Sequence, residues 1–388
     1  MATSNDRLFS QAFIALTASE LAYFLAGGLL IGITPFFVLG PVEGDAAGLG
    51  LVFAAFSVTT LLLRPVAGRL ADRRGRRPLL ILGALLCAVV LLAHAVIDDL
   101  AVLIGLRLAL GATEAIYFVA AIAALADLAP PGRAGEALSY NSLALYLGLA
   151  IGPVLGQGLV ALGGFPVAWI GAAGLALLAG LLALRIPETS PSLGRATPSA
   201  PWIHRAAIAP GIALGLGVAT MSAFFALGGP HAERIGLQAW SVTYLLFGGV
   251  VVAARLALAR LPDRYPAIPV IALALSLCGV GTLLTAVTPG VAGLLVGAGV
   301  LAVGVALLTP AVFAAIFAIV SPAERGVASG TASAFIDLGF GVGPLVVGSV
   351  AASLGIPAAF GLAAGVALAG SVATLLVPRR RPRTVGVA

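Results

Sequence analysis

Four ionisable side chains stand inside long apolar runs of this 388-residue chain: Glu20, Arg107, Glu114 and Asp337. A charged group inside lipid is costly, so such residues face a bundle interior or an aqueous cavity and mark ion or proton pathways. Glu114 follows Arg107 by seven residues, which places both on one helix face, about 10 Å apart along the axis. A carboxylate near a buried arginine can change its charge with conformation, as proton coupling requires.

Other chemistries find little support in the sequence. The three histidines are scattered without metal-ligand spacing, and the chain has no phosphate-binding loop for a nucleotide. The run GAGVLA at 297–302 matches a loose dinucleotide fingerprint, but it lies inside an unbroken apolar segment. Cys87 and Cys278 are each flanked by apolar residues and are interpreted as buried free thiols. We therefore expect no metal, no cofactor and no enzymatic activity.

The composition identifies the elements that must position these side chains. Hydrophobic residues make up 61% of the chain and charged residues 9%, and the mean hydropathy is +1.13. Soluble domains are usually about 45–50% apolar, so this is an integral membrane protein. A membrane-spanning helix needs roughly 20 apolar residues. Twelve segments qualify: 12–38, 47–67, 78–97, 100–126, 137–162, 165–186, 206–229, 238–259, 268–288, 291–320, 327–353 and 356–377.

The distribution of arginine predicts how the chain is oriented. The loops after even-numbered spans and both termini hold nearly all the loop arginines, including five at Arg69, Arg73, Arg74, Arg76 and Arg77. The opposite loops hold Arg234 alone. Because arginine-rich loops stay in the cytoplasm, we expect a multi-pass protein of the cell membrane with both termini cytoplasmic. The arginine cluster is thus a cytoplasmic loop between spans 2 and 3, and no nucleic-acid partner is expected.

The chain repeats itself at an offset of 191 residues without a gap, and the matches include its only two cysteines. Transporters with a central site use two such parallel halves. The sequence therefore predicts an all-α membrane protein with twelve helices in two pseudo-symmetric six-helix bundles, at 1–186 and 206–388, joined by a Pro- and Ser-rich cytoplasmic linker at 187–205. Matched pairs include Arg64 with Arg255, Asp72 with Asp263, Cys87 with Cys278, Gly148 with Gly339, Gly152 with Gly343, and Pro153 with Pro344.

Three motifs together resemble one family. GRLADRRGRRP at 68–78 resembles the loop signature between spans 2 and 3 of the major facilitator superfamily. LIGLRLALGATEA at 103–115 is similar to the arginine-containing element of its span 4, although Leu110 and Thr113 depart from the pattern. GLAIGPVLGQG at 148–158 is similar to the span-5 signature of the drug/proton antiporter branch. The resemblance covers the whole chain and implies the twelve-span major facilitator fold.

The resemblance implies a conformational gate in the first loop signature. In it, Asp72 would cap a neighbouring helix start, expected at span 11, and one of Arg69, Arg73 or Arg76 would pair with Asp127. The competing interpretation makes this loop a topology determinant only. The gate residues are Gly68, Asp72, Arg73, Gly75, Arg76 and Asp127.

The glycines of span 5 repeat every four residues and line one helix face. Together with a proline that bends the helix, they are interpreted as a hinge, either a pivot or a seal between the halves. A packing motif alone is the competing interpretation. The residues are Gly148, Gly152, Pro153 and Gly156.

Two further arginines and two tyrosines complete the candidates. Arg64 and Arg255 lie close enough to the cytoplasmic helix ends to extend their charges into water, and no functional role is predicted for them. Tyr23 shares a helix face with Glu20, and Tyr117 shares one with Glu114.

These observations predict a monomeric secondary transporter that exports small, rather lipophilic organic compounds in exchange for protons, by alternating access. Glu114, Asp337 or Glu20 would carry the proton, Arg107 would modulate its affinity, and Tyr117 would help to form the substrate cavity. Proton-coupled uptake and sugar efflux by the same fold stay open, as does, less favoured, a non-transporting receptor or a membrane enzyme.

Overall fold

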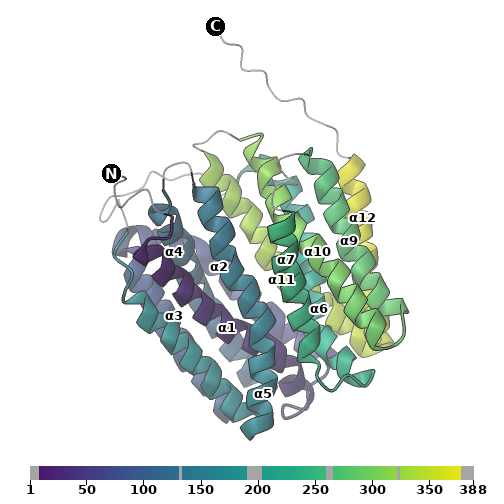
Figure 1. The fold of residues 1–388 in the computed structure, drawn as a ribbon. Helices are drawn as coiled ribbons and strands as arrows, with labels where there is room; N and C mark the ends of the chain where they lie inside the picture. Colours follow the sequence, from purple (N-terminus) through teal and green to yellow (C-terminus); the bar gives the residue numbers. More distant parts are fainter. Residues whose placement is uncertain (1–7, 131–132, 190–202, 259–264, 321–323, 377–388) are drawn as a thin grey trace.

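The computed structural model describes residues 8–130, 133–189, 203–258, 265–320 and 324–376 (Figure 1). Every regular element in these ranges is a helix. The elements are α1 (Gln11–Leu39), α2 (Ala46–Arg74), α3 (Arg76–Ala93), η2 (His94–Val96), α4 (Leu100–Leu128), α5 (Ala134–Ala183), η3 (Arg205–Ala207), α6 (Ile208–Arg234), α7 (Ser241–Ala257), α9 (Ala267–Val287), α10 (Gly290–Phe317), α11 (Arg325–Leu354) and α12 (Ile356–Leu376).

Three helices of the first half begin at a side-chain cap. Ser10, Asp45 and Asp99 precede α1, α2 and α4, and each accepts a hydrogen bond from the backbone N–H three residues further on, at 3.2, 2.7 and 2.9 Å. These bonds satisfy donors that the first helical turn leaves without a partner. The observed starts lie within one residue of the predicted spans 12–38, 47–67 and 100–126, whereas α2 continues to Arg74, beyond its predicted end.

The helix α5 contains two predicted spans. Gly163 and Gly164 leave helical geometry, and Gly164 has φ +75°, a conformation that favours glycine. The close approach of Gly171 to Leu159 shows that the chain folds back at this break. A Cβ placed on Gly171 would lie 2.6 Å from the Leu159 side chain. Residues twelve apart on one straight helix would be separated by about 18 Å. The two segments, 134–162 and 165–183, therefore form an antiparallel pair, as the predicted spans 5 and 6 require.

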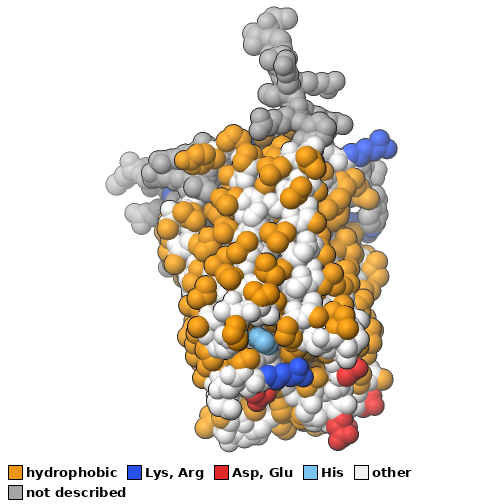
Figure 2. Space-filling view, turned by 90° about the vertical axis from the view of Figure 1, so that its right-hand side faces the viewer, with side chains coloured by type: hydrophobic (Ala, Val, Ile, Leu, Met, Phe, Trp, Pro, Cys, Tyr) orange, Lys and Arg blue, Asp and Glu red, His pale blue; other side chains and the backbone are white. Residues whose placement is uncertain are grey.

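The described residues supply the twelve predicted crossings. Ten helices are long and apolar enough to cross a membrane, and one of them is the broken α5. The shorter apolar helix α7 provides the remaining crossing. Large apolar side chains cover the outer surface, as the broad hydrophobic face in Figure 2 shows. Leu62, Val89 and Leu354 are among those more than 60% exposed. Such a surface suits lipid, whereas soluble monomers rarely expose contiguous apolar patches larger than a few hundred Å².

The helix contacts repeat between the two halves of the chain. In the first half α1 packs on α5 and α2 on α4, and in the second half α6 packs on α11 and α7 on α10. These are the same pairs after a shift of 191 residues, so the sequence repeat has a matching structural repeat. The halves meet where α2 lies against α11, α5 against α7, and α1 against α6 (Figure 1). Most of the predicted linker 187–205, and the predicted repeat residue Asp263, lie outside the described residues.

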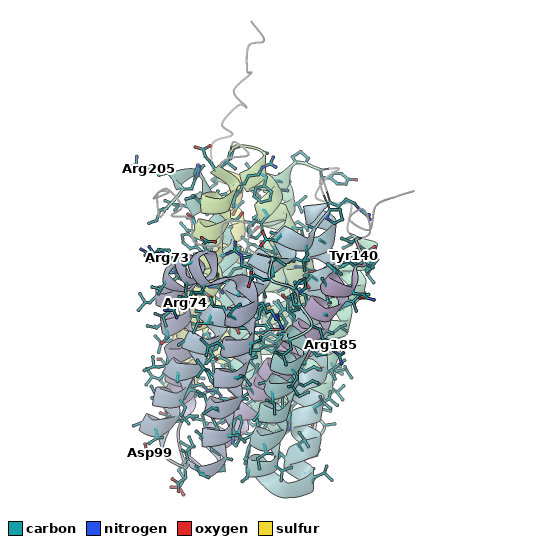
Figure 3. All side chains as sticks on the ribbon, turned by 90° about the vertical axis from the view of Figure 1, so that its left-hand side faces the viewer. Arg73, Arg74, Asp99, Tyr140, Arg185 and Arg205 are labelled. Carbon is teal, nitrogen blue, oxygen red and sulfur yellow. The ribbon has the colours of Figure 1, made fainter. Side chains whose placement is uncertain are left out.

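The two ends of the bundle carry opposite charge. Arg73, Arg74 and Arg205 lie toward one end and Asp99 lies at the other (Figure 3). We call these the arginine-rich end, defined by Arg73 and Arg74, and the acidic end, defined by Asp45 and Asp99.

Candidate functional site

A small cavity lies in the first half, closed on one side by the second half. Its volume is about 90 Å³, which is below the 300–1,000 Å³ typical of sites for drug-sized ligands. The cavity must therefore widen in another state to hold such a molecule. It is lined by residues of α1, α2, α3 and α4 and by one side chain of α11: Tyr23, Ala26, Gly27, Leu30, Ile31, Phe53, Phe56, Ser57, Cys87, Leu91, Arg107, Leu110, Thr113, Glu114 and Phe340.

Glu114 is the carboxylic acid of this cavity. It lies near the middle of α4 and interacts with the Tyr23 side chain. It also interacts electrostatically with Arg64 of α2 and Asp337 of α11. The cavity acid is therefore in electrostatic contact with the interface between the halves.

Arg107 is the cation of the same cavity and is only 5% exposed. It donates a hydrogen bond to the Thr34 hydroxyl, which in turn donates to the Leu30 carbonyl at 2.5 Å. The Nε atom of Arg107 has no partner among the described residues. Arg107 and Glu114 line one cavity, as their seven-residue spacing predicts, but no ion pair between them is formed.

Asp337 forms a salt bridge across the two halves. Arg64 donates to it from Nε at 2.5 Å and from the terminal nitrogen at 2.8 Å. The prediction that Arg64 extends toward water is wrong, because the carboxylate of the facing helix α11 draws the guanidinium into the interface. Arg64 also lies 5.0 Å from the ring centre of Phe118. The pair lies about 15 Å along α2 from the arginine-rich end, by the rise of a helix.

Arg255 makes the matching contact from the second half. It donates to the Tyr146 hydroxyl at 3.0 Å and to Ser142 at 3.2 Å, both on α5. The prediction that Arg255 extends toward water is therefore also wrong. The offset of 191 relates Arg64 to Arg255 and relates Tyr146 to Asp337. Each half thus reaches across with an equivalent arginine, and only one of the two acceptors is charged.

Glu20 and Tyr117 lie outside the cavity lining. Asn141 of α5 donates a hydrogen bond to one oxygen of Glu20, and the other oxygen has no partner among the described residues. Tyr117 is fully buried, bonded to Ser19 at 2.7 Å and stacked on Tyr23 with ring centres 3.9 Å apart. Tyr117 therefore supports the cavity wall through Tyr23.

The contacts of the predicted gate stay within the first half and the start of the linker. Arg76 bridges Asp72 at 2.7 Å and Asp127 at 3.3 Å. The Glu188 carboxylate, which follows α5, accepts hydrogen bonds from the backbone N–H groups of Arg76 and its neighbour at 2.8 and 3.2 Å. Glu188 is thus the carboxylate at the start of α3.

Among the other gate residues, Gly75 occupies a position that requires glycine. Gly75 has φ +99°, and a Cβ there would lie 2.2 Å from the Glu188 carboxylate. Gly68 sits in α2, and Arg73 is exposed. Capping of span 11 by Asp72 stays a prediction, because the turn before α11 includes 321–323, outside the described residues.

The span-5 glycines also act within one half. A Cβ on Gly152 would lie 2.4 Å from a backbone atom of Leu29 in α1, and Gly148 and Gly156 approach the same helix. Pro153 packs against Gly32 of α1 in this seam. The seal that these residues form therefore joins α1 to α5, and does not join the two halves.

Toward the acidic end, different residues bring the halves together. Gln157 donates to the Gln238 carbonyl at 2.8 Å and accepts from the Ser241 backbone at 3.1 Å. Phe36 and Trp240 stack with ring centres 4.4 Å apart. The halves therefore contact each other on both sides of the cavity, through the arginines on one side and through these residues on the other. A ligand can pass only if the halves separate on one of these two sides.

Comparison with known proteins agrees with this architecture. The family model described as Major Facilitator Superfamily matches residues 16–299 and, in a second match, residues 263–388. An uncharacterized MFS-type transporter of Salmonella typhimurium is 30% identical over 94% of this chain and 96% of its own length. One of Burkholderia mallei is 30% identical over 96% and 93%. The chain belongs to the major facilitator superfamily. It is a multi-pass membrane transporter, and its relatives are transporters, not enzymes.

Solved structures show the same fold. The nucleoside transporter NupG matches with a TM-score of 0.78 at 16% identity, over 94% of this chain and 99% of that chain. The human organic anion transporter MFSD10 matches with a TM-score of 0.72 at 21% identity, over 94% and 98%. Their different cargoes show that the fold alone does not select a substrate.

Proposed function

We propose that this transporter exports small, largely apolar organic compounds in exchange for protons, as a member of the drug/proton antiporter branch. The observation that carries the proposal is a single carboxylic acid, Glu114, in an otherwise mostly apolar cavity lining. Few polar groups line the cavity, which suits lipophilic compounds better than sugars, since a sugar needs many hydrogen bonds. Both termini are proposed to be cytoplasmic, which makes the arginine-rich end the cytoplasmic end.

Glu114 is proposed to carry the proton. It is the one acid among the three candidates that lines the cavity, whereas Asp337 is held by Arg64 and Glu20 by Asn141. A proton and a substrate entering the same cavity can exclude each other there. Such competition is the condition for exchange, because the carrier then returns with one or the other.

The arginine contacts between the halves are proposed to act as the movable gate. Opening the arginine-rich end must break the Arg64–Asp337 pair and the Arg255 contacts with α5. Glu114 interacts with both members of the first pair. A change of its charge therefore changes the electrostatic balance at the gate, which connects protonation to the movement of the halves.

The experiment is a pH measurement in inverted membrane vesicles whose lumen has been acidified by respiration. Addition of a substrate outside should make the lumen more alkaline, because export into the lumen removes protons from it. Further acidification would identify a proton symporter instead. Transport without any substrate-dependent pH change would contradict proton coupling. Vesicles without the protein provide the control.

A further inference from the structure

Arg107 is a buried cation with no acidic partner among the residues that the structure describes. Its side chain is 5% exposed, and it takes part in none of the ion pairs that the described residues form. Thr34, its one hydrogen-bond partner in the described part of the chain, is neutral. A guanidinium keeps its charge at neutral pH, and a buried charge without a counter-charge is costly unless another group compensates it.

Arg107 lies where a ligand in the cavity could supply the missing negative charge. Arg107 lines the cavity, and its Nε is buried without a partner among the described residues. Thr34 is itself held by the Leu30 carbonyl at 2.5 Å, so it fixes one edge of the guanidinium. The unused donor is the Nε–H of the Arg107 guanidinium. A guanidinium is suited to a carboxylate, because arginine binds the two carboxylate oxygens through paired N–H donors.

Glu114 does not fill this role. It lies about 10 Å further along α4, and the arginine with which it interacts electrostatically is Arg64. His94, which interacts electrostatically with Arg107, holds the Val90 carbonyl at 2.8 Å through Nδ1 and cannot supply a negative charge. The charged ends of the cavity are therefore separate, a cation at Arg107 and an acid at Glu114.

Apolar side chains make up most of the rest of the lining. Leu30, Phe53, Leu110 and Phe340 line the cavity together with Arg107 and Glu114. A molecule that fits must place an acidic group at one end and an apolar body along the rest.

We propose that the substrate is an amphiphilic organic anion whose carboxylate binds Arg107, with its apolar body against the phenylalanine and leucine side chains of the cavity. This assignment rests on the proposed transport function and names its substrate class. Exchange of an anion for a proton would move net charge, so it would be driven by membrane voltage as well as by pH.

The test is ligand binding to the purified full-length protein in detergent, measured by titrated thermal unfolding. The probes are benzoate, 1-naphthoate and octanoate, each beside the amide and the primary amine of the same skeleton. At least one carboxylate should bind more tightly than its amide and amine. In Arg107→Gln its dissociation constant should rise at least about tenfold, because a charged hydrogen bond is lost, while Arg107→Lys should retain part of the preference.

A second variant keeps the test informative if Arg107→Gln unfolds. A Cβ on Gly27, in the cavity lining, meets no atom within 4 Å, so Gly27→Leu should fill the cavity without disturbing its backbone and should abolish carboxylate binding. Gly105 of α4 is equally open but outside the lining, and Gly105→Leu should bind like the wild type.

Three outcomes would overturn the assignment: tighter binding of the amines, no binding of any carboxylate, or unchanged carboxylate affinity in folded Arg107→Gln, replaced by Gly27→Leu if Arg107→Gln unfolds. Binding is read without a proton gradient, so it separates the two proposals. Carboxylate binding without pH movement in vesicles would refute proton exchange alone. If only amines changed the lumen pH of the vesicles, that result would refute the anion assignment but not proton exchange.

Discussion

At the scale of single residues, the charges inside the bundle have distinct environments. Asp337 is matched by a bidentate arginine from the other half, and Glu20 is held by an amide. Arg107 and Glu114 face the cavity without a charged partner in direct contact. Charges that are compensated within the protein suit structural or gating roles, and those facing a cavity suit ligands and protons.

Breaking the Arg64–Asp337 pair at one residue should destabilise the closed arrangement. Arg64→Gln leaves a buried carboxylate without its partner, for which the expected cost is about 3 kcal/mol. The melting temperature in detergent should fall, and the double variant Arg64→Gln, Asp337→Asn should recover most of the loss. Additive losses in the double variant would show that the two side chains are not coupled.

At the scale of elements, glycine seams fix how each half is built. The α1–α5 seam has its counterpart at α6–α11, where a Cβ on Gly339 would lie 2.5 Å from the Gly215 carbonyl. In lipid such close packing replaces the hydrophobic effect as the force that joins helices. Each half can then move as a unit against the other.

A bulky residue in this seam should prevent folding. Gly152→Leu must displace the α1 backbone, because the added Cβ alone lies 2.4 Å from it. We expect loss of the monodisperse peak in detergent size-exclusion chromatography. Gly158→Leu, on the same helix with no atom within 4 Å of the added Cβ, is the matched control and should behave as the wild type. Equal behaviour of the two variants would contradict the seam.

At the scale of the whole molecule, two equivalent arginine contacts join the halves. Arg64 binds the charged carboxylate of Asp337, whereas Arg255 binds neutral hydroxyl groups. The Arg64–Asp337 contact is therefore the stronger one, because hydrogen bonds between charged groups are stronger than hydrogen bonds between neutral groups. Opening of the arginine-rich end should accordingly depend more on Arg64 than on Arg255.

The native cysteines allow this to be measured. Cys87 lines the cavity and Cys278 is fully buried elsewhere. In a Cys278→Ser background, N-ethylmaleimide should label Cys87 faster in Arg64→Gln than in the parent, with a smaller increase in Arg255→Gln. Cys87→Ser supplies the zero level. Equal labelling rates in all variants would contradict a gate at these arginines.

The sequence predicts the number and the starts of the helices because apolar length acts locally, but it ends span 2 at residue 67, whereas α2 continues to Arg74. It predicts that Arg107 and Glu114 share a cavity because both lie on one helix face. It does not predict the Arg64–Asp337 pair, because their meeting depends on how α2 packs against α11. Likewise, the spacing of Gly152 and its neighbours defines a helix face but not the helix that covers it.

The most direct test of proton coupling uses Glu114→Gln with a compound that alkalinises the lumen of wild-type vesicles. In proteoliposomes, this variant should still exchange labelled for unlabelled compound, since the cavity keeps its shape. It should show no substrate-dependent pH change, whereas Glu20→Gln should retain it. A pH change in Glu114→Gln equal to that of the wild type would contradict the assignment of the proton to this acid.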